Sequence, residues 1–82
     1  MLKGIIRGNI VSTRKQESLV GSKFMEVELI ENGKLTDKYV IAIDTVGAGI
    51  GETVLITTGS SARLALNNTQ APADAVIVGI VD

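Results

Sequence analysis

Hydrophobic residues in this sequence form short β-branched runs that alternate with groups of turn-forming residues. Several short strands separated by turns are typical of an all-β sandwich or barrel. The runs that we predict to be strands are 2–11, 24–30, 38–44, 53–58 and 75–81. The stretch 59–66 has helical spacing and predicts one or two helical turns, with Ser60 or Ser61 as the N-cap. Pro72 is expected in a loop.

The first two predicted strands alternate between their two faces. In strand 2–11, one face is expected to hold Leu2, Gly4, Ile6, Gly8 and Ile10, and the other face Lys3, Ile5, Arg7 and Asn9. In strand 24–30, the residues expected to point inward are Met25, Val27 and Leu29. Glu26 and Glu28 are expected to contact water. Asn32 and Gly33 then predict a tight turn, within a loop expected at 31–37.

Two of the predicted strands do not alternate. Residues 39–43 and 76–80 are apolar on both faces. A strand that is apolar throughout is covered on both sides, and a single layer of five strands in so short a chain provides only one cover. The second cover must be another subunit, or the short helix where it reaches. The pattern therefore predicts an obligate oligomer.

Length and composition strengthen the prediction of an oligomer. The 82 residues suffice for one domain, 1–82, and domains of this size bury only about 60% of the surface that their unfolded chains expose. Disulfides, a structural metal or oligomerisation usually stabilise such domains. The sequence has no cysteine and no histidine, which excludes disulfides and the ordinary zinc, haem and iron–sulfur ligand sets. No metal or cofactor is expected, and oligomerisation is the remedy that is left.

The charge distribution argues against binding to nucleic acid or to a membrane. The formal net charge is −1, whereas binding to a phosphate backbone requires a basic surface. No apolar run approaches the roughly 20 residues that a membrane helix needs. Arg7 and Asn9 interrupt any apolar signal-peptide segment near the start. A cysteine-free chain with these features is expected in the cytoplasm.

The glycine-rich stretch 47–51 invites comparison with nucleotide-binding loops. A dinucleotide-binding fingerprint has the spacing G-x-G-x-x-G and opens a helix. Here Gly51 comes one position early, Glu52 occupies the place of the third glycine, and a strand follows. We expect instead that Gly47, Gly49 and Gly51 permit positive φ angles and close backbone approach. Such a loop suits a place where copies of one chain crowd around a symmetry axis.

The polar residues that resemble catalytic groups lack activating partners. Ser60 and Ser61 would need a base, and the sequence has no histidine and no lysine three residues after either serine. We therefore predict helix capping and no enzymatic activity. The carboxylates of Asp44 and Glu52 are expected to stabilise turns or to contact water. For Arg63 the alternatives are a solvated side chain and an intersubunit ion pair, with Asp44 or Glu52 as the candidate partner; we favour the ion pair.

Two further features keep an alternative open. Thr13 and Lys15 belong to a small basic group, for which a solvated loop and a contact with a neighbouring protein are equally good interpretations. A five-stranded barrel also raises the oligonucleotide-binding (OB) fold, whose members stack bases on aromatic side chains. Only Phe24 and Tyr39 are available for stacking.

Several segments, taken together, resemble the EutN/CcmL family of pentameric vertex proteins of bacterial microcompartments, such as carboxysomes and metabolosomes. The matching segments are GNIVSTRK (8–15), SLVGSK (18–23), AIDTVGAGIGETVL (42–55), GSSAR (59–63) and PADAVIVGIVD (72–82). The segment 42–55 is the most diagnostic. The segments occur in order and fill most of the chain, which makes the resemblance specific.

The resemblance implies an OB-like barrel of five strands with one short helix, assembled as a ring. It also implies a structural function: a homopentamer that caps the vertices of a microcompartment shell in the cytoplasm, with hexameric shell proteins as partners. The candidate residues for the subunit interface and the axis are Ile5, Arg7, Thr13, Lys15, Asp44, Gly47, Gly49, Gly51, Glu52, Ser60, Ser61 and Arg63. The short loop 31–37 favours a metabolosome over a carboxysome. The alternative function is an OB-type module that binds nucleic acid or a small ligand.

Overall fold

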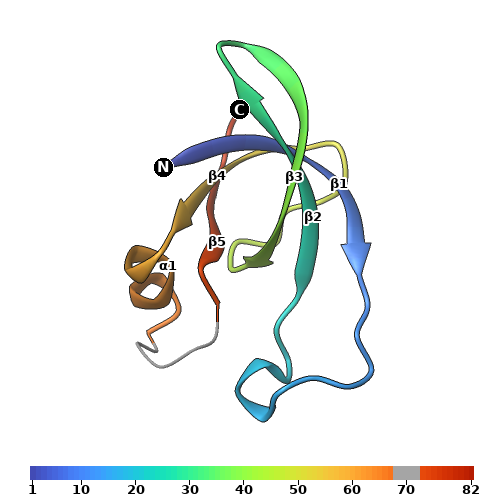
Figure 1. The fold of residues 1–82 in the computed structure, drawn as a ribbon, viewed down its shortest axis with the longest axis vertical. Helices are drawn as coiled ribbons and strands as arrows, with labels where there is room; N and C mark the ends of the chain where they lie inside the picture. Colours follow the sequence, from blue (N-terminus) through green and yellow to red (C-terminus); the bar gives the residue numbers. More distant parts are fainter. Residues whose placement is uncertain (68–72) are drawn as a thin grey trace.

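The computed structural model describes residues 1–67 and 73–82, which form strands curved around a common core and one short helix at their side (Figure 1). In chain order the elements are β1 (Leu2–Ile10), the 3-10 turn η1 (Glu17–Leu19), β2 (Phe24–Glu31), β3 (Lys34–Asp44), β4 (Thr53–Thr58), α1 (Ser60–Ala65) and β5 (Ala75–Ile80). Pro72, which we predicted to lie in a loop, is outside the described residues.

The strands close into a barrel in the order β1-β2-β3-β5-β4. Neighbouring strands are antiparallel except for β3 and β5, which are parallel. The predicted all-β fold, a five-stranded barrel with one short helix, is confirmed. β4 has its predicted bounds, and β1 and β5 each end one residue earlier than predicted.

The turn between β2 and β3 is shorter than the loop predicted at 31–37. Asn32 and Gly33 have positive φ angles of 52° and 74°, and Glu31 pairs with Lys34 on either side of them. A two-residue turn with two positive φ angles matches the twist of the flanking strands. β3 therefore begins at Lys34 instead of residue 38, and the prediction of a loop up to residue 37 is wrong.

A β-bulge at Arg7 changes which residues of β1 share a face. Between Ile6 and Gly8, β1 advances by two residues while β2 advances by one. Arg7 is therefore an extra residue, and the alternation of faces reverses beyond it. The predicted faces are right up to Arg7. They are wrong for Gly8, Asn9 and Ile10, which lie on the faces opposite to those predicted.

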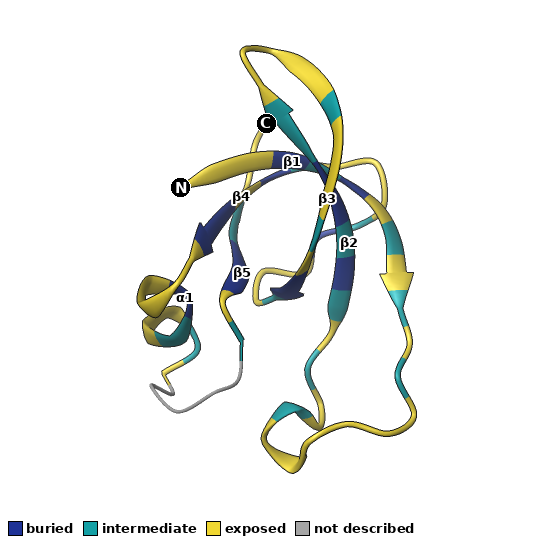
Figure 2. Ribbon diagram, viewed as in Figure 1, coloured by how far each residue is buried: buried dark blue, intermediate teal, exposed yellow. Residues whose placement is uncertain are grey.

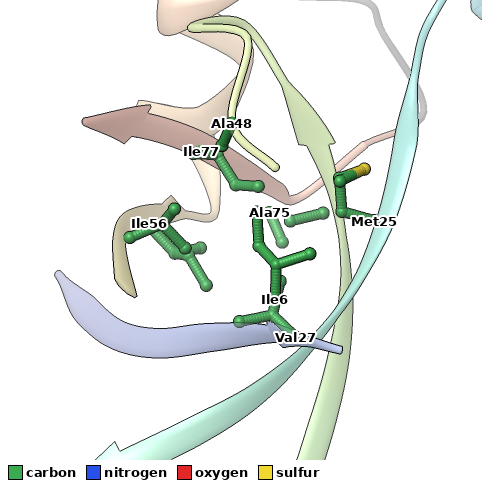
Figure 3. Close-up of a cluster of buried hydrophobic side chains, with 9 residues drawn as sticks. Ile6, Met25, Val27, Ala48, Ile56, Ala75 and Ile77 are labelled. Atoms are coloured by element: carbon green, nitrogen blue, oxygen red, sulfur yellow. The ribbon is translucent and has the colours of Figure 1, made fainter. Parts of the chain in front are cut away.

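The barrel interior contains one continuous aliphatic core (Figure 3). Its buried members are Ile6, Met25, Val27, Ala42, Ala48, Val54, Ile56, Ala75 and Ile77. Met25 and Val27 point inward as predicted, and Leu29 is partly buried against the same core. Every strand contributes to this core, so that the barrel depends on pairs far apart in the sequence.

A second, smaller cluster lies between the outer face of the barrel and α1. Ile43 of β3 and Val76 of β5 are buried there with Ala62 of α1, and Leu19 packs against them. The helix thus supplies the second cover where β3 and β5 meet. Ile41, two residues earlier on β3, is still 56% exposed. Figure 2 shows that much of β3 is exposed. Within residues 1–67 and 73–82, part of the second cover that the apolar pattern predicted is therefore missing.

α1 is not capped by a serine. Its N-cap is Gly59, with a φ of 65°, and no side-chain hydrogen bond caps the helix. Glycine adopts this left-handed φ without a steric cost, and its N–H donates to the carbonyl of Asp74 at 2.9 Å. The predicted capping by Ser60 or Ser61 is wrong. No helix within the described residues is long and apolar enough to cross a membrane.

Candidate functional site

The loop from Asp44 to Glu52 is organised around the Asp44 carboxylate. This carboxylate accepts hydrogen bonds from the backbone N–H groups of Val46 at 2.9 Å, Gly47 at 3.2 Å and Ala48 at 2.9 Å. The Asp44 side chain is 1% exposed, and Lys23 Nζ lies 4.0 Å from its Oδ2. Asp44 therefore stabilises a turn of its own chain. This is one of the two roles predicted for its carboxylate; the other was contact with water.

The second half of the same loop is tied to β1. Gly49 N–H donates to Glu52 Oε1 at 2.6 Å. Gly51 N–H donates to the Ile6 carbonyl at 2.8 Å, and Ile6 N–H donates to the Glu52 carbonyl at 3.0 Å. The N–H groups of Gly49 and Gly51 are of the kind that a phosphate-binding loop would present to an anion. Here both are engaged within the chain.

The glycines of the loop differ in their backbone conformation. Gly47 and Gly51 have φ angles of 77° and 90°, as expected, whereas Gly49 does not have a positive φ. A Cβ atom added to Gly49 would lie 3.4 Å from Glu52 Oε1, which is an ordinary contact. The prediction of a positive φ is thus confirmed for two of the glycines and wrong for Gly49.

Glu28, which we predicted to contact water, is a buried carboxylate that links three strands. Its residue is 6% exposed. Glu28 Oε1 accepts hydrogen bonds from Arg7 Nε at 3.0 Å and from the Tyr39 hydroxyl at 3.4 Å. Its Oε2 accepts one from the Asp37 backbone N–H at 3.1 Å. The prediction failed because Arg7 and Tyr39, from the neighbouring strands, cover this position on the outer face.

The environment of Glu28 fixes its charge and that of Tyr39. Burial raises the pKa of the Glu28 carboxyl, but the hydrogen bonds from Arg7 and Asp37 and the charge of Arg7 outweigh burial, so that this pKa lies below its ordinary value of 4.5. Burial, and then the charge of Glu28, raise the pKa of Tyr39 above 10.0. At neutral pH the cluster is an ionised carboxylate with a neutral phenol. It is a structural ion pair and not a proton-transfer site.

The predicted residues of α1 lie apart from the loop. Ser60 and Ser61 are exposed and Arg63 is half-buried. Within the described residues the ion pairs are Arg7–Glu28, Lys23–Asp44 and Lys38–Glu31. Arg63 therefore pairs with neither Asp44 nor Glu52 inside one chain. The intersubunit ion pair of Arg63 stays a prediction.

Thr13 and Lys15 lie between β1 and η1, and Lys15 lines an open surface pocket of about 360 Å³. Lys15 Nζ donates a hydrogen bond to the Ser12 carbonyl of the same loop. The pocket is lined by Asn9, Ile10, Val11, Ser12, Lys15, Ser22, Lys23 and Phe24. Both of its lysines contact acceptors of this chain, Ser12 and Asp44. In the described part of the chain, no group of three acidic side chains is arranged to hold a metal ion.

The structure thus distributes the predicted residues over four places. The loop residues Asp44–Glu52 lie against β1, which also holds Ile5 and Arg7. The other candidates lie on α1 and in the loop before η1. Glu28 and Ile41 were not among the predicted functional residues, and Tyr39 was predicted only as a possible stacking residue. The apolar run 39–43 could have indicated Tyr39 and Ile41. Glu28 gave no such signal, because it occupies a regular polar position of an alternating strand.

The whole chain, residues 1–82, matches the family model described as ethanolamine utilisation protein EutN/carboxysome. A carboxysome shell vertex protein CcmL from Nostoc sp. is 49% identical over 79 residues, which are 94% of this chain and 78% of that protein. The bacterial microcompartment shell vertex protein EutN from Salmonella typhimurium is 40% identical over 83 residues, which are 100% of this chain and 84% of that protein.

Solved structures agree over the full chain. The structure of CcmL from Gloeobacter violaceus has a TM-score of 0.94 at 43% identity, covering 100% of this chain and 86% of that one. The GrpN pentameric microcompartment shell protein from Rhodospirillum rubrum has a TM-score of 0.87 at 41% identity, covering 100% and 93%.

The fold and these relatives define a class of protein: small single-barrel subunits of bacterial microcompartment shells. Within that class, the chain belongs to the EutN/CcmL family. The resemblance seen in the sequence is confirmed.

Proposed function

We propose that this chain assembles into a homopentamer that caps the vertices of a bacterial microcompartment shell. The observation that carries this proposal is the amount of aliphatic surface that one barrel leaves uncovered. The exposed large hydrophobic residues are Met1, Leu2, Val11, Val20, Leu35, Tyr39, Ile41, Val46, Ile50, Leu55, Leu64, Ile80 and Val81. Exposed apolar residues that gather into a contiguous patch mark sites of protein association, and Tyr39 and Ile41 lie two residues apart on β3.

The geometry of a closed shell gives the mechanism. A flat sheet of hexagonal units closes into a polyhedron only when five-fold units are inserted. A head-to-tail interface whose rotation closes after five copies produces such a unit. GrpN, whose structure is described as pentameric, supports this ring size for the chain. The partners are then hexameric shell proteins, and the location is the shell inside the cytoplasm.

The role is structural and not enzymatic. The relatives are shell proteins. The two buried carboxylates, Asp44 and Glu28, hold backbone turns and strands in place. Neither carboxylate is arranged to transfer a proton to a bound molecule.

The alternative, an OB-type module for nucleic acid, has less support. Stacking needs aromatic faces that are free. Phe24 packs against the cluster under α1, which leaves Tyr39, whose hydroxyl is bound to Glu28, as the one aromatic side chain that is largely exposed. The lysines of the open pocket beside β1 contact their own chain. Nothing in this arrangement favours a nucleic acid over a protein neighbour.

The preference for a metabolosome stays a prediction. It depended on the loop 31–37, which is a two-residue turn in the structure. The relatives include carboxysome and other microcompartment vertex proteins at comparable identity. The compartment is therefore better tested by the partner: binding to hexameric proteins of each type of shell.

Native mass spectrometry tests the proposed function directly. The expected result is one five-membered ring at micromolar concentration. A gel-shift experiment at low salt is expected to detect no complex with DNA or RNA. A chain that stays monomeric, or that binds nucleic acid specifically, would contradict the proposal.

A further inference from the structure

The turn between β2 and β3 contains a reactive pair of residues. Asn32 is the one asparagine in the sequence that a glycine follows. The side-chain amide of an asparagine is open to attack by the backbone nitrogen of the next residue, and the side chain of that next residue normally hinders the attack. Gly33 has no side chain, and a Cβ atom added to it would meet nothing within 4 Å. The nitrogen of Gly33 is therefore sterically free to react with Asn32.

The end of this hairpin projects from the barrel. Residues 31–35 are all exposed, and Figure 1 shows the turn at the top of the molecule. The pairing of β2 with β3 ends at Glu31 with Lys34, so the N–H of Gly33 lies outside the hydrogen-bonded ladder. Water and base therefore have access to both the amide and the nitrogen.

An irregularity separates the end of the hairpin from the rest of the barrel. Between the pair Glu28–Tyr39 and the pair Ile30–Leu35, β3 advances by four residues while β2 advances by two. Two residue pairs lie beyond this point, and a two-stranded segment so short is marginally stable. The turn is therefore expected to open without unfolding of the barrel. Opening frees Asn32 from the conformation of the closed turn, so that its amide reaches the attacking nitrogen.

We propose that Asn32 is a site of spontaneous deamidation. The Gly33 nitrogen loses its proton to base and attacks Cγ of Asn32. The N–Cγ bond forms, the Cγ–Nδ2 bond breaks, and ammonia leaves after taking up a proton. The product is a succinimide ring, which water opens at either carbonyl to give aspartate or isoaspartate. Water and base are the co-reactants, and no oxidation state changes.

The two products differ in their effect on the hairpin. Aspartate leaves the main chain as it was, and Asp-Gly suits this type of turn as Asn-Gly does. Isoaspartate continues the main chain through its side-chain carbon and adds one atom to a turn of two residues. The turn then no longer matches the twist of its strands, and the pairs next to it separate. Both products add one negative charge to a chain whose formal net charge is −1.

Peptide mapping of the folded, full-length protein tests the proposal. The protein is incubated in mildly alkaline buffer, digested and analysed by mass spectrometry, and isoaspartate is detected with an isoaspartyl methyltransferase. A sample taken before incubation corrects for reaction during digestion. We expect the mass gain of amide hydrolysis and isoaspartate at Asn32, and neither at Asn9. Asn9 is the internal control, because it is also exposed but pairs with Met25 and precedes the branched Ile10.

Limited digestion with trypsin measures the effect on the hairpin. Cleavage after Lys34 should be faster in the isolated isoaspartate form than in an Asn32→Asp variant, because the variant has the same charge and an unaltered main chain. Equal cleavage of the two would overturn the predicted opening of the hairpin.

Asn32→Gln is the matched variant for the chemistry. Its side chain keeps the amide but is one methylene longer, which disfavours ring closure, so the mass gain at this position should be lost. Circular dichroism before incubation checks that the variant is folded. The proposal would be overturned by an unchanged Asn32 in the folded protein under conditions where the chain in urea reacts there. Equal reaction at Asn9, or aspartate without isoaspartate, would overturn it as well.

Discussion

At the scale of single residues, Glu28 joins the two irregular parts of the outer face. Its carboxylate accepts hydrogen bonds from Arg7, at the bulge of β1, and from Asp37. Asp37 has a φ of 62°, which is uncommon for a residue with a side chain. One buried anion thus stabilises both a bulge and a strained residue on neighbouring strands.

Replacing this anion should make stability depend less on pH. The folded-state pKa of Glu28 lies below 4.5, so its ionised form stabilises the fold above that pH and the contribution is lost as the pH falls through the folded pKa. Glu28→Gln is expected to lower the Tm at pH 7, and the difference from wild type should shrink towards pH 3. Glu31→Gln, at an exposed pair with Lys38, should change little. A Tm difference for Glu28→Gln that is the same at both pH values would contradict this role.

Gly4 is required because β1 and β2 approach closely there. A Cβ atom added at Gly4 would lie 2.5 Å from Val27 Cγ1 and 2.7 Å from the Glu28 carbonyl oxygen. Gly4→Ala is therefore expected to destabilise the fold by about 1–3 kcal/mol, measured by urea unfolding. The control is Gly8→Ala on the same strand, where an added Cβ meets nothing within 4 Å. Equal stabilities for the two variants would refute the close approach.

At the scale of elements, the sequence pattern predicts the strands well and their irregularities poorly. Strand 53–58 and the turn at Asn32 and Gly33 follow from local chemistry, and both are present. The bulge at Arg7 depends on the register with β2, which is a tertiary property. The burial of Glu28 likewise depends on side chains from two other strands. Such features have no local signal, so the sequence could not predict them.

The loop from Asp44 to Glu52 offers a test of glycine conformation within one element. Gly51 has a φ of 90°, a conformation that costs a residue with a Cβ atom roughly 1–2 kcal/mol. Gly51→Ala is expected to lower the unfolding free energy by that amount. Gly49→Ala should have a smaller effect, because Gly49 lacks a positive φ. The opposite order in urea unfolding would mean that the loop has another conformation in solution.

At the scale of the whole molecule, the strand pattern predicted the fold and the resemblance implied the class of function, but neither predicted the contact surfaces. The absence of cysteine and histidine and the excess of aliphatic residues pointed to an oligomer. The predicted interface residues are scattered over four places on the barrel, and the sequence does not indicate which of them meet a neighbour. The second cover over the outer face is also only partial: α1 packs against Ile43 and Val76, whereas Ile41 is exposed.

Stability should therefore depend on protein concentration. A ring that forms only from folded chains stabilises them by mass action. We expect the Tm of the wild type to fall on dilution. Differential scanning fluorimetry over a hundredfold range of concentration would measure this shift. A wild-type Tm independent of concentration would contradict assembly coupled to stability.

The free edge of β3 also has a consequence for the life of a newly made chain. Among the residues that the structure describes, no strand pairs with the second edge of 34–42, beside the exposed Ile41. Any extended segment of another polypeptide competes for that edge, and misdirected pairing of this kind leads to aggregates. Surplus synthesis without matching shell components should thus be harmful, with inclusion bodies as its visible outcome.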